Sequence, residues 1–210
     1  LSAFLALTAC NAREPAPRDG GAGAETEEQT ATEPTSLDVE DSPPPVEDTV
    51  PECSINSLAY TTLDGKPSTL ADFKGKAVLI VNTASACGHT PQYDGLEKLH
   101  AELAPRGFTV LDFPSNDFGG QEPLEAEGIA TFCSTKFGVT FPLTEKVGVK
   151  EGDGQSPVYA FLGKSTGSLP NWNFCKYVID PDGNPKAFFP SKTTPDSAEL
   201  REAIEAVLPK

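Results

Sequence analysis

Cys87 has the sequence context of a reactive thiol, because it follows a buried strand and precedes a helix. Residues 77–81 (Ala-Val-Leu-Ile-Val) form a continuous apolar run, as in a strand covered on both faces. Thr90 and Pro91 have the residue types of a helix N-cap and a first helical position. A thiol at this junction would face unpaired backbone N–H groups and the positive end of a helix dipole, which favour the thiolate. The sequence therefore predicts a reactive thiol; the alternative is a buried structural cysteine.

Two further segments join a predicted strand to a polar loop. Residues 113–123 (Phe-Pro-Ser-Asn-Asp-Phe-Gly-Gly-Gln-Glu-Pro) end one strand and begin a helix, and residues 171–177 (Asn-Trp-Asn-Phe-Cys-Lys-Tyr) contain the one tryptophan of the chain. Together with the loop around Cys87, they resemble three motifs of the glutathione peroxidase family, in the same order. The resemblance covers residues 57–210. It implies a thioredoxin-like fold and a peroxidase that reduces hydrogen peroxide or organic and lipid hydroperoxides through a cysteine sulfenic acid, with no metal or cofactor.

The resemblance also implies the roles of individual residues. Cys87 takes the place of the peroxidatic residue, and Gln121, Trp172 and Asn173 align with the polar groups around it. Attack of a thiolate on a peroxide leaves negative charge on the departing oxygen. Neutral N–H donors aimed at that oxygen stabilise it by about 3 kcal/mol each. Taken singly, the two amides could instead cap loops and the tryptophan could belong to the core.

Cys133 matches the resolving cysteine of the thioredoxin-dependent branch of the family. It would condense with the sulfenic acid on Cys87 before further oxidation, and its helix would have to loosen. The alternative is a core cysteine, because Cys133 lies on the apolar face of a predicted helix. The family's other common cysteine position holds Ser115, and Cys175 is most simply a small core residue.

The partners follow from the same comparison of motifs. Nothing basic near Cys87 is suited to the carboxylates of glutathione, so we expect a thioredoxin-like protein as reductant, with glutathione as the other candidate. Residues 163–171 form a short segment where oligomeric members of the family carry an insertion, so we expect a monomer. The acidic balance argues against nucleic acid as a partner.

The first 56 residues differ in composition from the rest. Residues 1–10 are apolar and stop at Cys10, like the end of a signal peptide with a bacterial lipobox. Residues 11–56 carry −10 of the net charge of −15 and seven prolines, and such a segment cannot bury enough apolar surface to fold. We therefore expect a domain tethered to the bacterial cell envelope by a disordered acidic segment, with Cys10 lipidated. An ordinary cleaved signal and a periplasmic location are the alternative.

Residues 57–210 have the pattern of one α/β domain. After a hairpin in residues 57–70, the predicted order of parallel inner strands and an antiparallel return gives a thioredoxin-like fold, with a central mixed sheet flanked by helices. The expected strands are 77–82, 108–113, a short one near Phe141, 175–180 and 186–189, and the expected helices are 91–105, 124–136, one opened by Ser156 and Pro157, and 197–207.

Two other classes of function use the same scaffold. A dithiol–disulfide oxidoreductase would need a second cysteine where Thr90 stands, three residues after Cys87. A non-catalytic binding module would tolerate the loss of Cys87. Residues 163–167 (Gly-Lys-Ser-Thr-Gly) match the tail of a P-loop but follow a predicted helix rather than a strand. His89 is more simply a loop residue than half of a Cys–His dyad.

Overall fold

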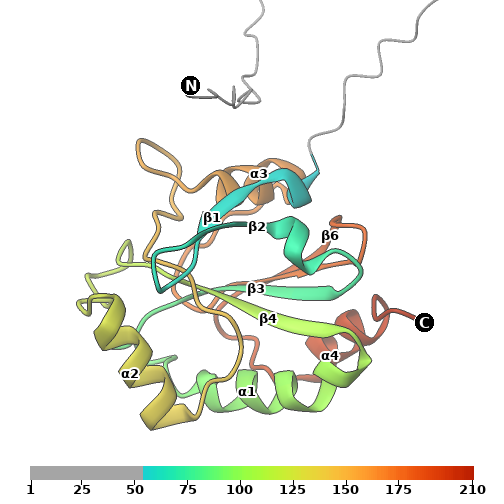
Figure 1. Ribbon diagram of the computed structural model, residues 1–210, viewed down its shortest axis with the longest axis horizontal. Coiled ribbons are helices and arrows are strands. Elements are labelled where there is room, and N and C mark those ends of the chain that lie inside the picture. Colours follow the sequence, from blue (N-terminus) through green and yellow to red (C-terminus); the bar gives the residue numbers. More distant parts are fainter. Residues whose placement is uncertain (1–53) are drawn as a thin grey trace, which may run out of the picture. The chain divides into compact units, whose positions relative to one another are not determined.

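Apart from the expected strand near Phe141, the strands and helices of residues 54–210 follow one another in the order expected from the sequence (Figure 1). The computed structural model describes residues 54–210, which form one folded unit. The signal-peptide end, the lipidation candidate Cys10 and the acidic tether up to residue 53 lie outside the described residues. The elements are η1 (Ile55–Ser57), β1 (Ala59–Thr61), β2 (Pro67–Thr69), η2 (Leu70–Phe73), β3 (Ala77–Thr83), α1 (Gln92–Leu103), η3 (Ala104–Arg106), β4 (Phe108–Pro114), α2 (Ala126–Phe137), α3 (Pro157–Thr166), β5 (Lys176–Ile179), β6 (Pro185–Phe189) and α4 (Ala198–Glu205).

The folded part begins a few residues before the predicted boundary, because Ile55 belongs to the core. The Ser54 side chain caps η1 by accepting a hydrogen bond from the Asn56 N–H. Ile55 is 2 % exposed and packs in one cluster with Leu70 and Phe73. Full burial of such a side chain contributes about 2–3 kcal/mol. The described folded unit therefore includes residues 54–56, which precede the predicted start at residue 57.

The central sheet is built around β3. This strand pairs in parallel with β4, from Ala77 opposite Phe108 to Thr83 opposite Pro114. It pairs antiparallel with β5, and β6 returns antiparallel to β5, which gives the strand order β4-β3-β5-β6. The crossover between β3 and β4 contains α1, as a parallel pair requires. This arrangement confirms the predicted thioredoxin-like fold.

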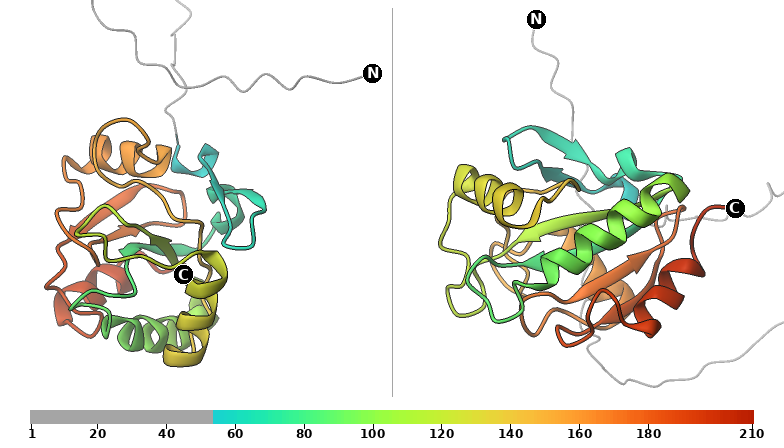
Figure 2. Two further views of the ribbon diagram at one scale, coloured as in Figure 1. Left: turned by 90° about the vertical axis from the view of Figure 1, so that its left-hand side faces the viewer. Right: turned by 90° about the horizontal axis from the view of Figure 1, so that it is seen from below.

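The two faces of β3 contribute to two separate parts of the core. Leu79 and Val81 pack in the cluster that includes residues of α1, α2 and α4, whereas Val78 and Ile80 pack in the cluster that includes residues of η2 and α3. Successive strand residues point to opposite faces. The continuous apolar run therefore corresponds to a strand covered on both sides, and Figure 2 shows α1 and α4 opposite α3 and the β1–β2 hairpin across the sheet.

The predicted strand near Phe141 does not form. Phe141 is buried, but the segment makes isolated bridges only, one of them a parallel bridge between Leu143 and Asp112. Pro142 lies between the two apolar residues and has no N–H to continue a ladder. Its carbonyl accepts a hydrogen bond from the Asp112 N–H at 3.0 Å. The segment therefore covers the edge of β4 without extending the sheet.

Candidate active site at Cys87

The Cys87 loop is closed by the hydroxyl of Thr90. Thr90 Oγ1 accepts a hydrogen bond from the Cys87 N–H at 3.0 Å and donates one to the Ala84 carbonyl at 2.8 Å. Thr90 was expected to cap α1, but the N-cap is Pro91, which offers no side-chain cap. The N-cap prediction is thus wrong by one residue, because the hydroxyl has a better pair of partners inside the loop.

Cys87 lies just beneath the surface with one backbone donor on its sulfur. The residue is 7 % exposed, while its neighbours Ala86 and Gly88 are exposed. The His89 N–H donates a hydrogen bond to Cys87 Sγ at 3.4 Å, and within residues 54–210 this is the one hydrogen bond to that sulfur. The His89 ring instead contacts Gln92, with 3.3 Å between Nδ1 and Nε2. A backbone donor of this kind stabilises negative charge on sulfur.

The segment that carries Gln121 is fastened to the Cys87 loop. The Ala86 N–H donates to the Gln121 carbonyl at 2.9 Å. The next residue, Glu122, is fully buried, and its carboxylate accepts hydrogen bonds from the Ser85 N–H and the Ser85 hydroxyl, both at 2.8 Å. It also accepts one from the Leu124 N–H at 3.3 Å. Sequence patterns did not single out Glu122, which is one acidic residue among many, but the structure shows that it holds the Cys87 loop.

Asn173 and Gln121 form an amide pair. Asn173 is fully buried, and its Nδ2 donates to Gln121 Oε1 at 3.0 Å. The Asn173 Oδ1 is buried and has no hydrogen-bond partner among the described residues. Oxygen and nitrogen of an amide are exchanged by a half-turn of the group. In the turned pair, Gln121 would be the donor and the unpaired atom of Asn173 would be an N–H.

Trp172 is the exposed member of the site. Its side chain is 39 % exposed, and its ring packs on Phe118 with 5.7 Å between ring centroids. The Trp172 carbonyl accepts a hydrogen bond from Asn82 Nδ2 at 3.0 Å, at the end of β3. Phe174, two residues on, is the one non-glycine residue in the described part of the chain with a positive φ, of 66°. This left-handed turn directs the loop back into β5.

The three expected donors are therefore placed around the Cys87 loop but not on its sulfur. Gln121 joins the loop through its backbone and joins Asn173 through its side chain. Within the described residues, no hydrogen bond joins Cys87 Sγ to the Gln121 amide, the Asn173 amide or the Trp172 indole. Their role toward the departing oxygen of a peroxide stays a prediction.

A buried lysine ties the loops of the site together. Lys176 is fully buried, and its Nζ donates to Gln92 Oε1 at 2.6 Å, to the Phe174 carbonyl at 2.8 Å and to the Thr193 carbonyl at 2.6 Å. Burial lowers the pKa of Lys176 to about 8. An ammonium group has three N–H bonds for these three oxygens. Sequence analysis missed this role, because the three acceptors come from segments far apart in the chain.

Cys133 lies on the buried face of α2. It is 1 % exposed and belongs to the same apolar cluster as Cys87. Burial and, next, the nearby Asp112 carboxylate raise the pKa of the Cys133 thiol to about 12. Cys87, Cys133 and Cys175 are all free thiols in this structure. Cys175 is fully buried, as expected for a core residue, with Sγ 3.5 Å from Ser191 Oγ.

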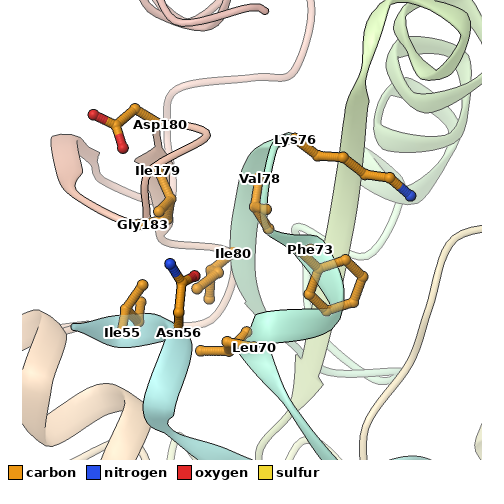
Figure 3. Close-up of a pocket in the computed structure, with 10 residues that line it drawn as sticks. All are labelled: Ile55, Asn56, Leu70, Phe73, Lys76, Val78, Ile80, Ile179, Asp180 and Gly183. Atoms are coloured by element: carbon orange, nitrogen blue, oxygen red, sulfur yellow. The ribbon is translucent and has the colours of Figure 1, made fainter.

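Other candidate features lie away from these loops. A hollow of about 10 Å³, large enough for roughly one water, lies between η1, η2 and the β5–β6 turn. Figure 3 shows the residues that line it. The hollow is lined mainly by apolar residues such as Leu70 and Phe73, and its Asp180 is paired with Lys186 at 2.8 Å. The segment 163–167 forms the end of α3 and its C-cap at Gly167. Helix carbonyls point outward there, which is unsuited to phosphate.

The fold and these loops define a thioredoxin-like protein with a single thiol in the loop between β3 and α1. A model of the family described as glutathione peroxidase matches residues 55–163. The glutathione peroxidase-like peroxiredoxin GPX5 of Chlamydomonas reinhardtii is 47 % identical over 155 residues, which cover 72 % of this chain and 94 % of that protein. The hydroperoxy fatty acid reductase gpx1 of Synechocystis is 43 % identical over 165 residues, 74 % of this chain and 96 % of that protein. The crystal structure of Trgpx in apo form has a TM-score of 0.59 and 33 % identity, covering 73 % of this chain and 97 % of that one. The chain belongs to the glutathione peroxidase family.

Proposed function

We propose that this protein is a thiol peroxidase in which Cys87 attacks the peroxide. The observation that carries the proposal is the buried Cys87 sulfur between exposed neighbours, with the His89 N–H directed at it. The thiolate forms a bond to one peroxide oxygen while the O–O bond breaks. The other oxygen leaves with a proton as water or an alcohol, and the sulfur becomes a sulfenic acid.

The amide pair and Trp172 would stabilise the departing oxygen. Gln121 and Asn173 hold each other, so a small rotation of one amide frees an N–H without loss of buried structure elsewhere. The unpaired polar atom on buried Asn173 is a site that gains a partner when a peroxide oxygen arrives. Trp172 adds an exposed aromatic surface beside this position, which suits the chain of an organic hydroperoxide as well as hydrogen peroxide.

We propose that Cys133 resolves the sulfenic acid and that a thioredoxin-like protein reduces the resulting disulfide. Glutathione is the alternative reductant. Ile129 and Cys133 of α2 are buried, Phe132 and Phe137 are partly buried against the core, and the outer face of the helix is exposed, so α2 can open locally while the sheet stays folded. A helix anchored in this way can loosen and deliver its cysteine. We propose a monomer, because no step of this cycle needs a second chain.

We propose further that Cys10 carries a lipid that tethers the domain to the bacterial cell envelope. The support is the run Leu7-Thr8-Ala9-Cys10 followed by the acidic, proline-rich segment. No helix within residues 54–210 is long and apolar enough to cross a membrane. Fractionation of the tagged full-length protein, with Cys10→Ser as control, tests this proposal. Recovery of the parent protein in the soluble fraction at the level of the variant would refute it.

The peroxidase cycle is tested by treating the reduced protein with one equivalent of peroxide and mapping the cysteines by mass spectrometry. We expect a disulfide between Cys87 and Cys133, with Cys175 unmodified. Stable sulfinate on Cys87 with Cys133 still a thiol would remove the resolving role. If Cys87 stays unmodified, the proposed peroxidase function is excluded. Disulfide exchange on a substrate such as insulin without peroxide turnover would instead indicate a dithiol–disulfide oxidoreductase.

A further inference from the structure

Asp112 is a buried carboxylate that the cycle described above does not use. It lies in β4, and its side chain is fully buried with hydroxyl partners on both oxygens. The Thr83 hydroxyl donates to Oδ1, and the Tyr93 hydroxyl donates to Oδ2 at 2.9 Å. A buried carboxylate without a cation is costly and calls for an explanation.

The same tyrosine connects Asp112 to the candidate resolving thiol. Tyr93 of α1 is 1 % exposed and packs in the same apolar cluster as Cys133, and its hydroxyl donates to Asp112. The same hydroxyl, as a hydrogen-bonding neighbour of the Cys133 thiol, lowers the pKa of that thiol. The three side chains therefore form a buried row from carboxylate to phenol to thiol. Within residues 54–210 the titratable groups that act on Asp112 come from four directions and include no cation: Tyr93 of α1, Glu122 of the loop before α2, Cys133 of α2 and Tyr159 of α3.

We propose that Asp112, acting through Tyr93, is the proton acceptor for Cys133 in the resolving step. This inference rests on the proposed resolving role of Cys133. Tyr93 would pass its proton to Asp112 and take the proton of the thiol, so one negative charge moves from the carboxylate to the sulfur. The pocket then holds a single charge throughout, whereas loss of the thiol proton beside an ionised Asp112 would place two anions in it.

The Cys133 thiolate attacks the Cys87 sulfur of the sulfenic acid, the S–O bond breaks and the S–S bond forms. The Cys133 sulfur is oxidised and the Cys87 sulfur is reduced. The departing hydroxide takes a proton from solvent and leaves as water, and Asp112 returns its proton to solvent. The thiolate is poorly solvated on the buried face of α2, so it gains hydration when the helix lifts.

Burial makes Asp112 suitable for this task near neutral pH. Desolvation raises the pKa of Asp112 from 3.8 to about 7, against the two hydroxyl hydrogen bonds, which lower it. An acceptor with a pKa close to the working pH is the most effective one. Protonation below that pH removes the acceptor, so the rate of disulfide formation falls as the pH falls through about 7.

The test measures both steps in one single-turnover experiment between pH 5.5 and 8.5. The reduced full-length protein receives one equivalent of hydrogen peroxide; remaining peroxide reports the oxidation of Cys87, and alkylation followed by mass spectrometry reports the disulfide. We expect Asp112→Asn to slow disulfide formation about 100-fold at pH 7.5 and to abolish the inflection near pH 7. Tyr93→Phe, which removes one oxygen, should slow the same step.

Thr83→Val is the matched control, because Thr83 donates to Asp112 Oδ1, whereas Tyr93 donates to Oδ2. Its hydroxyl lowers the pKa of Asp112, so the variant should move the inflection to higher pH while disulfide formation still reaches a plateau. Consumption of the first equivalent of peroxide shows that each variant is folded. If Asp112→Asn and Tyr93→Phe keep the parent rate and pH profile, the proton-acceptor role is refuted alone. If the parent protein oxidises Cys87 but never forms a disulfide with Cys133, the resolving role fails and this inference fails with it.

Discussion

The buried Asp112 makes a direct prediction about stability, independent of any catalytic role. Its pKa is raised from 3.8 to about 7 in the folded protein, mainly by desolvation. Between these two values the folded state binds a proton that the unfolded state has lost. Its contribution to stability is therefore fully present below about pH 4 and is lost as the pH rises through 7. Linkage converts this difference into about 4 kcal/mol.

Asp112→Asn removes this dependence and keeps the shape of the side chain. Its amide can donate to one hydroxyl oxygen and accept from the other hydroxyl. The free energy of unfolding of the variant minus that of the parent should therefore rise by about 4 kcal/mol between pH 4 and pH 8. Other titrating groups cancel in this difference, whatever its absolute value at one pH.

Urea unfolding of the reduced proteins, followed by the fluorescence of Trp172, measures the difference at several pH values. Thr83→Val serves as a control in the opposite sense. It raises the pKa of Asp112 further, so it should steepen the loss of stability with pH. If the difference in free energy of unfolding between Asp112→Asn and the parent stays constant from pH 4 to pH 8, then Asp112 is not desolvated. Its proposed role as proton acceptor near neutral pH would then be excluded as well.

Three other substitutions test the site. Lys176→Met leaves three buried oxygens without a donor, which costs about 1 kcal/mol for each oxygen. We therefore expect circular dichroism to show a Tm lower by about 6–12 °C. An unchanged Tm would contradict the role of Lys176 in holding the loops together. Glu122→Gln places an N–H₂ group near the two hydrogen-bond donors of Ser85, so peroxide consumption should slow about tenfold. Equal rates in the variant and the parent would argue against a role of Glu122 in holding the Cys87 loop. Gln121→Leu should slow the same reaction about 100-fold and, because it takes the acceptor from buried Asn173 Nδ2, lower the Tm by about 2–4 °C. Parent-like kinetics would exclude Gln121 as a donor.

The fold was predictable because its signals are local or periodic. The apolar run of β3 and the helical spacing of α1 each identified an element within a few residues of its observed bounds. The Ser156–Pro157 start of α3 was also visible, and the Ser156 side chain does accept a hydrogen bond from the Val158 N–H. The thioredoxin-like order then followed from chain topology.

The polar groups that organise the site were not visible in the same way. Glu122 and Lys176 find their partners across long stretches of sequence, and nothing local distinguishes them from surface charges. Thr90 looked like a helix cap, but its hydroxyl closes the Cys87 loop. The family motifs identified Gln121 and Asn173 as a group, yet only the structure shows that they bind each other rather than the sulfur.

The proposed peroxidase chemistry requires that Cys87 alone reacts with peroxide. The most direct measurement is the rate at which the reduced protein consumes a stoichiometric amount of hydrogen peroxide, for the parent and for Cys87→Ser, Cys133→Ser and Cys175→Ser. We predict that Cys87→Ser loses the reaction, while Cys133→Ser and Cys175→Ser still consume one equivalent at the parent rate. Consumption by Cys87→Ser at the parent rate, or loss of the reaction in Cys175→Ser alone, would show that Cys87 is not the residue that attacks the peroxide.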